Sequence, residues 1–187
     1  MLGAMRFAVL VAALLTNLSR VQAQPFDFAQ DKPFDFAQGK LFDFAQGKSA
    51  DAERDAVLKT VQAFFDTMTA KDVEGARKIL QPQGRFHAMR MRDGKPDVRA
   101  FSNEEYFATL QAGEQKMRER MWNPEVRIHG LIATVVAPYD FWIDGKLSHC
   151  GTDAFDLIKT EEGWKLAGGV YTIESKCEPS PLGPLKQ

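Results

Sequence analysis

The chain has 187 residues, with 24 Lys and Arg, 25 Asp and Glu and three His, for a formal net charge of −1. This balance lacks the basic excess that attracts nucleic acid or anionic lipid, so neither is an expected partner. The length allows one domain of ordinary size together with flanking segments.

The first 23 residues have the pattern of a secretory signal peptide. Arg6 precedes an apolar run from Phe7 to Leu15, and the segment ends in Val21-Gln22-Ala23, a small-residue cleavage site. This run is less than half of the roughly 20 apolar residues that span a bilayer, so no membrane span is expected. We expect cleavage near Ala23 and a secreted or periplasmic protein.

An eight-residue unit then occurs three times, as PFDFAQDK-PFDFAQGK-LFDFAQGK from Pro25 to Lys48. A period of eight builds neither a helix face nor a strand face, and it is shorter than the roughly 20 residues of a solenoid repeat. We expect residues 24–48 to form a disordered tether. A role as an adhesive or partner-binding arm is the alternative.

One globular domain is predicted over residues 49–175, followed by a Pro-rich tail at residues 176–187. Its first element is a helix in DAVLKTVQAFFDTM, because apolar residues from Val57 to Met68 recur at helical spacing. A second, shorter helix is predicted in KDVEGARKIL, with Asp72 as its N-cap. Gln81-Pro82-Gln83-Gly84 ends it.

The apolar period then changes to two, which predicts strands. GRFHAMRMRDGKPDVRAF forms two strands joined at Asp93-Gly94, and SNEE is a capping box that opens a short helix. The later strand candidates are KMRERMWNPEVRIH, LIATVVAPYDFWI, LSHCGTDAFDLIK and GWKLAGGVYTIES. Asp144-Gly145 and the loop at 160–163 join the last three as hairpins. Helices followed by long antiparallel strands give an α+β fold class.

This order of elements resembles the nuclear transport factor 2-like superfamily, most closely its SnoaL-like and Putative lumazine-binding branches. The resemblance covers about residues 51–175 and rests on FFDTMTAKDVEGARKIL and on ATVVAPYDFWIDGKLSHCGTDAFDLIKTEEGWKLAGGVYT. It implies a cone-shaped, curved antiparallel sheet wrapped round the N-terminal helices, with an internal pocket and a homodimer formed through the sheet. It implies no single activity, because the superfamily includes isomerases, dehydratases, hydrolases and binding modules.

The hairpin turns predict which side chains share a face of the sheet. One face is apolar near Phe155 and polar at its other end, where His149 lies between Asp140 and Glu174. A histidine between two carboxylates suits a general acid or base, and a solvated polar rim is the alternative. We expect the following residues to line a ligand pocket: Trp142, Val136, Asp153, Phe155, Glu174, Tyr106, Phe65 and His87.

The opposite face predicted by this register is strongly apolar, which favours a homodimer partner on the outside of the sheet. It includes Ala133, Val135, Ala137, Tyr139, Phe141, Cys150, Ala154, Ala167, Gly169, Tyr171 and Ile173. With two tyrosines assigned to this outer face, only Tyr106 remains for an isomerase-like pocket. No metal or cofactor is expected, since the histidines lack ligand spacing and no nucleotide-binding or nucleophile motif occurs.

Cys150 and Cys177 are the only cysteines, and export permits a disulfide between them. A bridge requires the chain to turn back just after Ser175, which the following prolines allow. Two free thiols are the alternative.

These patterns support three functional hypotheses. The first is an exported small-molecule-binding protein. The second is a cofactor-independent dehydratase, isomerase or hydrolase that uses His149 with Asp140 as an acid–base pair. The third is a dimeric interaction module with a vestigial pocket.

Overall fold

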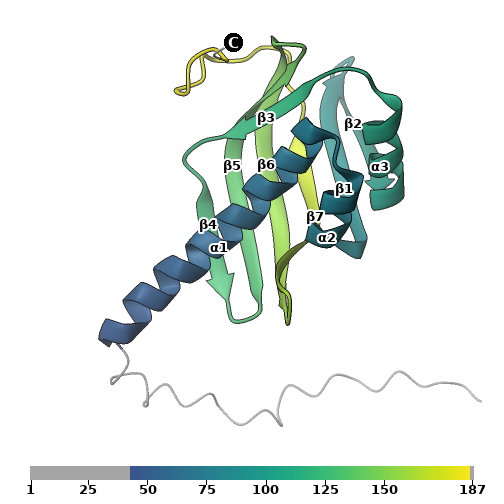
Figure 1. The fold of residues 1–187 in the computed structure, drawn as a ribbon. Helices are drawn as coiled ribbons and strands as arrows, with labels where there is room; N and C mark the ends of the chain where they lie inside the picture. Colours follow the sequence, from purple (N-terminus) through teal and green to yellow (C-terminus); the bar gives the residue numbers. More distant parts are fainter. Residues whose placement is uncertain (1–42, 186–187) are drawn as a thin grey trace, which may run out of the picture. The chain divides into compact units, whose positions relative to one another are not determined.

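The computed structural model describes residues 43–185, with side chains from Ala50 onward. The predicted signal peptide and most of the predicted tether lie outside the described residues. The helices are α1 (Asp43–Ala70), α2 (Val73–Ile79) and α3 (Asn103–Ala112). The strands are β1 (Leu80–Arg92), β2 (Lys95–Ser102), β3 (Met117–Met121), β4 (Glu125–His129), β5 (Ile132–Ile143), β6 (Lys146–Thr160) and β7 (Gly163–Thr172) (Figure 1).

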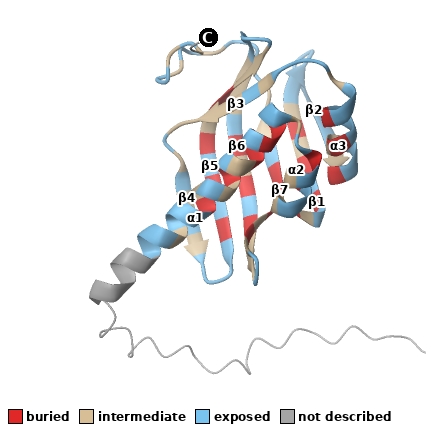
Figure 2. Ribbon diagram, in the orientation of Figure 1, coloured by how far each residue is buried: buried red, intermediate tan, exposed pale blue. Residues whose placement is uncertain are grey.

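The strands form one sheet in the order β2-β1-β7-β6-β5-β3, and β4 also pairs with β5. β1 and β7 run parallel, while the other neighbouring strands run antiparallel. α1 lies across one face of this curved sheet, and buried positions on the strands lie behind it (Figures 1 and 2). The α+β class and the sheet packed on N-terminal helices are confirmed.

α1 begins earlier than predicted, at Asp43, inside the third copy of the repeat that we assigned to a disordered tether. The added segment is rich in Ala, Gln, Lys, Glu and Arg and contains no proline, so the helix can extend through it. The predicted apolar stripe is buried, with Val57, Val61, Phe65 and Met68 among the core residues.

The predicted caps of the other two helices are confirmed. The Asp72 carboxylate accepts a hydrogen bond from the Gly75 N–H at 2.8 Å, at the start of α2. At the start of α3, the side chains of Ser102 and Glu105 each bond the other's backbone N–H in a capping box. These caps fix where α2 and α3 begin, and therefore how α3 lies beside β1 and β2.

The segment KMRERMWNPEVRIH forms two strands, β3 and β4, where one long strand was predicted. Asn123 has a positive φ of 46°, and Pro124 has no N–H to donate to the ladder. The chain therefore breaks at these two residues. β3 and β4 pair with opposite ends of the same edge of β5.

Two register shifts change the faces that the turns predicted. Near the hairpin, Trp142 pairs with Leu147, but beyond the shift Phe141 pairs with His149 and Asp140 with Cys150. A bulge adds one residue to one strand. Beyond the bulge, side chains of that strand that were expected on one face of the sheet therefore lie on the other face. A second shift between β6 and β7 leaves Phe155 opposite Gly169.

The predicted faces of β5 and of the end of β7 are therefore wrong. Alternate β5 residues that we assigned to the outside are buried against the helices and the cavity: Ala133, Val135, Ala137 and Tyr139. The apolar list that supported a homodimer mostly describes the inner face. Dimer formation stays a prediction, for an outer face that carries Val136 and Val170, 40% and 42% exposed.

Candidate ligand-binding cavity

A cavity of about 300 Å³ lies between the helices and the inner face of the sheet. This volume is at the lower end of the range for small-molecule sites. α1 and α3 contribute Phe64 and Tyr106 to its wall, β3 contributes Glu119, and β5 contributes Tyr139.

The first part of the wall is a row of five residues, three of them phenylalanines, on five neighbouring strands. We call it the aromatic row. Register places Val135, Phe155, Gly169, Phe86 and Phe101 side by side in that order. A Cβ at Gly169 would lie 2.9 Å from a ring carbon of Phe155, so glycine lets this ring pack flat on β7. Phe64 from α1 stacks on Phe86, with ring centres 5.5 Å apart. The aromatic row gives the cavity an apolar floor.

The next row on the same face is polar. Register places Ala137, Asp153, Tyr171, Ala88 and Arg99 side by side across the same five strands, β5, β6, β7, β1 and β2. All of these except Ala137 line the cavity. We call these five residues the polar row. It brings a carboxyl group, a phenol and a guanidinium to one wall.

Asp153 lies near a second carboxyl group, that of Glu119 on β3, close enough for each to shift the other's pKa. The Asp153 Oδ2 atom is buried and has no hydrogen-bond partner among the described residues. Burial raises the pKa of Asp153 to about 7, while the interaction with Glu119 acts in the opposite direction. Burial and the neighbouring Asp153 charge raise the pKa of Glu119 well above its usual range. Both pKa values are raised, so the pair favours sharing one proton, with Glu119 as the carboxyl group that holds it more readily.

Three tyrosines lie around this carboxyl pair. The Tyr139 hydroxyl donates a 2.6 Å hydrogen bond to the Thr172 carbonyl. The Tyr106 hydroxyl is buried and forms no hydrogen bond of normal geometry with any described residue; the hydroxyl of its neighbour Thr67 donates to the Phe64 carbonyl at 2.7 Å. Burial, then the charges of Glu119 and Asp153, raises the pKa of Tyr171 to about 12, so this phenol stays protonated. The prediction that Tyr139 and Tyr171 face away from the pocket is wrong, because a register shift separates each of them from the hairpin turn that set its predicted face.

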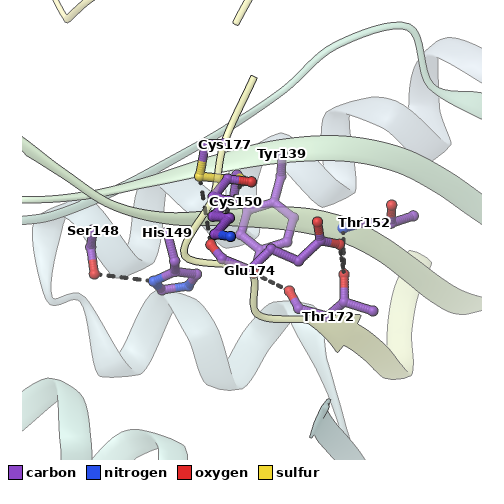
Figure 3. Close-up of a disulfide and its surroundings, with 9 residues drawn as sticks. Tyr139, Ser148, His149, Cys150, Thr152, Thr172, Glu174 and Cys177 are labelled. Carbon is purple, nitrogen blue, oxygen red and sulfur yellow. Dashed lines mark hydrogen bonds between the residues drawn. A yellow bond between two sulfur atoms is a disulfide. The ribbon is translucent and has the colours of Figure 1, made fainter. Parts of the chain in front are cut away.

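His149 lies on the cavity wall, between aromatic rings rather than between carboxylates. It stacks on Phe141 with ring centres 4.7 Å apart and meets the edge of Tyr139 at 5.9 Å. Its Nδ1 lies 3.1 Å from the Ser148 hydroxyl (Figure 3). Burial lowers the pKa of His149, which keeps the ring neutral at pH 7.

Asp140, the predicted partner of His149, lies on the other face of β5. Its carboxylate accepts two hydrogen bonds from the Arg120 guanidinium, at 2.9 and 2.5 Å. Arg120 also donates to the Gly183 carbonyl at 2.8 Å, so the C-terminal segment covers the ion pair and leaves Asp140 only 2% exposed. The predicted acid–base pair is therefore wrong, and Arg120–Asp140 ties β3, β5 and the C-terminal segment together.

The other predicted pocket residues divide between the wall and elsewhere. Asp153, Phe155 and Tyr106 are on the cavity wall. Phe65 is 1% exposed in the core beneath the cavity, and His87 alternates with the lining residues of β1, on the outer face. The bulges also place Trp142, Val136 and Glu174 away from the wall.

Cys150 and Cys177 form the disulfide that the sequence permits, with Cα atoms 5.8 Å apart. The chain continues β7 as far as Glu174, which exchanges two backbone hydrogen bonds with Cys150, and then turns back (Figure 3). The turn after Ser175 that a bridge requires is present. The disulfide thus joins the C-terminal segment to the outer face of β6.

Residues 43–185 hold no group of three or more His, Cys, Asp or Glu side chains placed to bind a metal ion. Within the same range, no helix combines the length and the apolar character needed to cross a membrane.

Sequence reasoning did not select Glu119 or Arg99. A signal for Glu119 was present, because the alternation Met117-x-Glu119-x-Met121 puts this acid on the same face as two apolar residues. Arg99 alternates with Phe101 in the same way. Neither residue is unusual in type, and only the curvature of the sheet brings them to one cavity with Asp153.

Comparison with known proteins agrees with this architecture. The family described as "Putative lumazine-binding" matches residues 52–172. A nuclear transport factor 2-like protein with a cystatin-like fold from Novosphingobium aromaticivorans superposes with a TM-score of 0.58 at 11% identity, over 75% of this chain and 94% of that one. No curated protein matches.

Two further solved structures have the same fold. A nuclear transport factor 2-like protein from Cytophaga hutchinsonii gives a TM-score of 0.54 at 17% identity, over 64% of this chain and 97% of that one. A "putative dehydratase" of this family from Streptomyces avermitilis gives 0.54 at 18% identity, over 68% and 99%. At these identities the likeness shows the fold alone.

Proposed function

Because the chain belongs to the Putative lumazine-binding family of nuclear transport factor 2-like proteins, we propose that it binds a small, largely aromatic molecule in the cavity. The observation that carries the proposal is a pair of buried oxygens on the cavity wall, the Tyr106 hydroxyl and Asp153 Oδ2, which form no hydrogen bond of normal geometry with any described residue. A buried polar oxygen of this kind costs free energy unless a ligand atom or water hydrogen-bonds with it.

The chemistry of the wall defines the kind of molecule that fits. The aromatic row and Phe64 offer ring faces and edges, which favour a flat, apolar body. Tyr106 and the Glu119–Asp153 pair offer donors and an acceptor for one hydroxyl or carbonyl group. An open cavity with unsatisfied polar groups is not expected for a vestigial pocket, so the interaction module is the least supported of the three hypotheses.

Calorimetric titration of the purified chain with 2-naphthol tests the proposal, because this probe has two fused rings and one hydroxyl group. We expect binding, and a loss of affinity of about tenfold in Tyr106→Phe if one neutral hydrogen bond to the probe disappears. No measurable binding of 2-naphthol, or an unchanged affinity in Tyr106→Phe, would contradict the proposed site.

A matched pair of variants ties the binding to the cavity. Ala88→Leu adds bulk to the cavity wall, while Ala100→Leu makes the same change on the exposed outer face of the same hairpin. We expect the first to abolish binding and the second to leave it unchanged. Equal effects of the two substitutions would place the probe outside the cavity.

Proton-transfer catalysis is the second candidate, and one observation favours it: Asp153 has a pKa of about 7 within an apolar cavity. A base whose pKa lies near the working pH is suited to general acid–base chemistry. Asp153 would accept the proton, and Glu119, which lies nearby, would adjust its basicity. This assignment replaces His149 and Asp140, which do not meet.

The probe 5-nitrobenzisoxazole tests this candidate without knowledge of the natural substrate. Removal of its C3 proton by a base breaks the ring N–O bond and gives a coloured cyanophenolate. We expect a rate above that of acetate buffer, with a pH profile that rises through about pH 7, and loss of the excess rate in Asp153→Asn. A rate that Asp153→Asn leaves unchanged would eliminate Asp153 as the base.

Export is also part of the proposal. The supporting observations are the signal-peptide pattern that ends at Ala23 and the Cys150–Cys177 disulfide, a bond typical of oxidising compartments. N-terminal sequencing of the protein recovered from the secreted or periplasmic fraction is the direct test. A chain found only inside the cell with Met1 retained would contradict export.

A further inference from the structure

The polar row has a charged group at each end. Asp153 on β6 and Arg99 on β2 are separated along the row by Tyr171 and Ala88, on two intervening strands. Three strand spacings of about 4.8 Å put their Cα atoms roughly 14 Å apart along the sheet. Both residues line the same cavity, so a ligand with two ring widths can reach from one end group to the other.

Most of the charged groups on the cavity wall are already paired. Arg90 donates to Asp97 at 2.9 Å. Glu105 accepts hydrogen bonds from the backbone and the hydroxyl of Ser102, at 2.7 and 3.0 Å, in the capping box of α3. Glu119 and Asp153 lie close enough to each other to shift each other's pKa.

Arg99 is the exception among the charged wall residues. Its guanidinium has no salt bridge within 4.0 Å to any of the described residues. Its charge does lower the pKa of two neighbours, Glu105 and Tyr171. Its register partner is Ala88, whose methyl side chain has no group that could pair with the guanidinium. Arg99 is an exposed residue of the cavity wall, so its donors are open to solvent and can reach a ligand in the cavity.

We propose that the natural ligand is an aromatic carboxylate, with its carboxylate on Arg99 and a hydroxyl or carbonyl group on Tyr106 and the Glu119–Asp153 pair. This inference rests on the proposed function and adds the charge and the orientation of the ligand. An arginine fork matches a carboxylate with two parallel hydrogen bonds. The rings lie between the two end groups, against Phe86 and Phe101.

Two probes of one ring system separate this inference from the proposed function. 2-Naphthol has only the hydroxyl group, and 6-hydroxy-2-naphthoate adds a carboxylate at the far end of the rings. We expect the carboxylate to improve affinity about tenfold in calorimetric titrations at low salt, as expected for charge-assisted hydrogen bonds in a partly exposed site. In Arg99→Gln this tenfold gain should disappear while the affinity for 2-naphthol stays within about twofold.

Arg127→Gln is the matched control, because Arg127 is an exposed residue of β4 outside the cavity wall and its loss changes the net charge equally. It should retain the full gain. The inference is overturned if the wild type binds 6-hydroxy-2-naphthoate no more tightly than 2-naphthol, or if Arg99→Gln keeps the tighter binding of the carboxylate. In either case, binding of 2-naphthol still supports the proposed function. Failure of both probes to bind overturns the two together.

Discussion

Asp153→Asn should remove a pH dependence of stability that the wild-type protein carries in its cavity. Asp153 is 1% exposed, and its pKa rises from an ordinary 3.8 to about 7 on folding. A carboxyl group whose pKa is raised in the folded state holds its proton there over a range in which the unfolded chain has lost it. Its contribution to stability is therefore present at low pH and is lost as pH rises through about 7.

The magnitude follows from the interval in which only the folded state is protonated. Between pH 5.5 and the pKa of about 7, each pH unit lowers the free energy of unfolding by about 1.4 kcal/mol. The wild type should thus lose roughly 2 kcal/mol between pH 5.5 and pH 8.5 because of Asp153, and Glu119 adds to the same trend. The amide of an asparagine side chain cannot titrate, so this loss of about 2 kcal/mol should be missing in Asp153→Asn.

Urea unfolding followed by tryptophan fluorescence measures the effect at both pH values. The surface acids with lowered pKa values, such as Glu53 and Glu162, titrate below this window and affect both proteins alike. His149 has a lowered pKa and acts in the opposite direction, and comparison with the variant cancels it. An equal change in wild type and Asp153→Asn would show that Asp153 has an ordinary pKa, and the proton-sharing pair would then be refuted.

Three other substitutions test the frame around the cavity. Cys177→Ser should lower the free energy of unfolding by roughly 3.5 kcal/mol, the chain-entropy value for the 27-residue separation from Cys150; urea denaturation in non-reducing buffer measures it, and wild type with reductant should lose as much. Gly151→Ala should cost several kcal/mol, since the new Cβ would collide with the Thr172 carbonyl; a Tm within about 2 °C of wild type would contradict the close packing. Val136→Lys, on the exposed outer face, should convert a dimer to a monomer in sedimentation experiments if the dimer uses this face; a species unchanged in mass would place any dimer contact elsewhere.

The sequence was sufficient to predict the order and type of the elements, because their signals are local. The stripe from Val57 to Met68, the cap at Asp72 and the turn at Asp144-Gly145 each specify a feature within a few residues. The break at Asn123-Pro124, which divides the predicted long strand into β3 and β4, also has a local cause in the missing N–H of the proline.

The candidate site could be predicted only in part, because it depends on which alternate residues of each strand face the cavity. The inward set of β6, including His149, Asp153 and Phe155, was assigned to the inner face and lies there. One additional residue near Ser148 reverses the parity of β5 relative to β6, and no glycine or proline marks this bulge. The consecutive glycines at 168–169 do accompany the second shift and could have warned of it. Each bulge exchanged a predicted wall residue for its neighbour, as with Asp140 and Tyr139.

The C-terminal segment has a consequence for any engineered version of this protein. A truncation after Ser175 would remove Cys177, which forms the disulfide with Cys150, and Gly183, whose carbonyl accepts a hydrogen bond from Arg120. The Arg120–Asp140 ion pair would then be open to water. Residues 177–183 therefore support the outer side of the wall that holds the carboxyl pair. A fusion partner or purification tag should therefore be attached after Gln187, so that Cys177 and Gly183 keep their contacts.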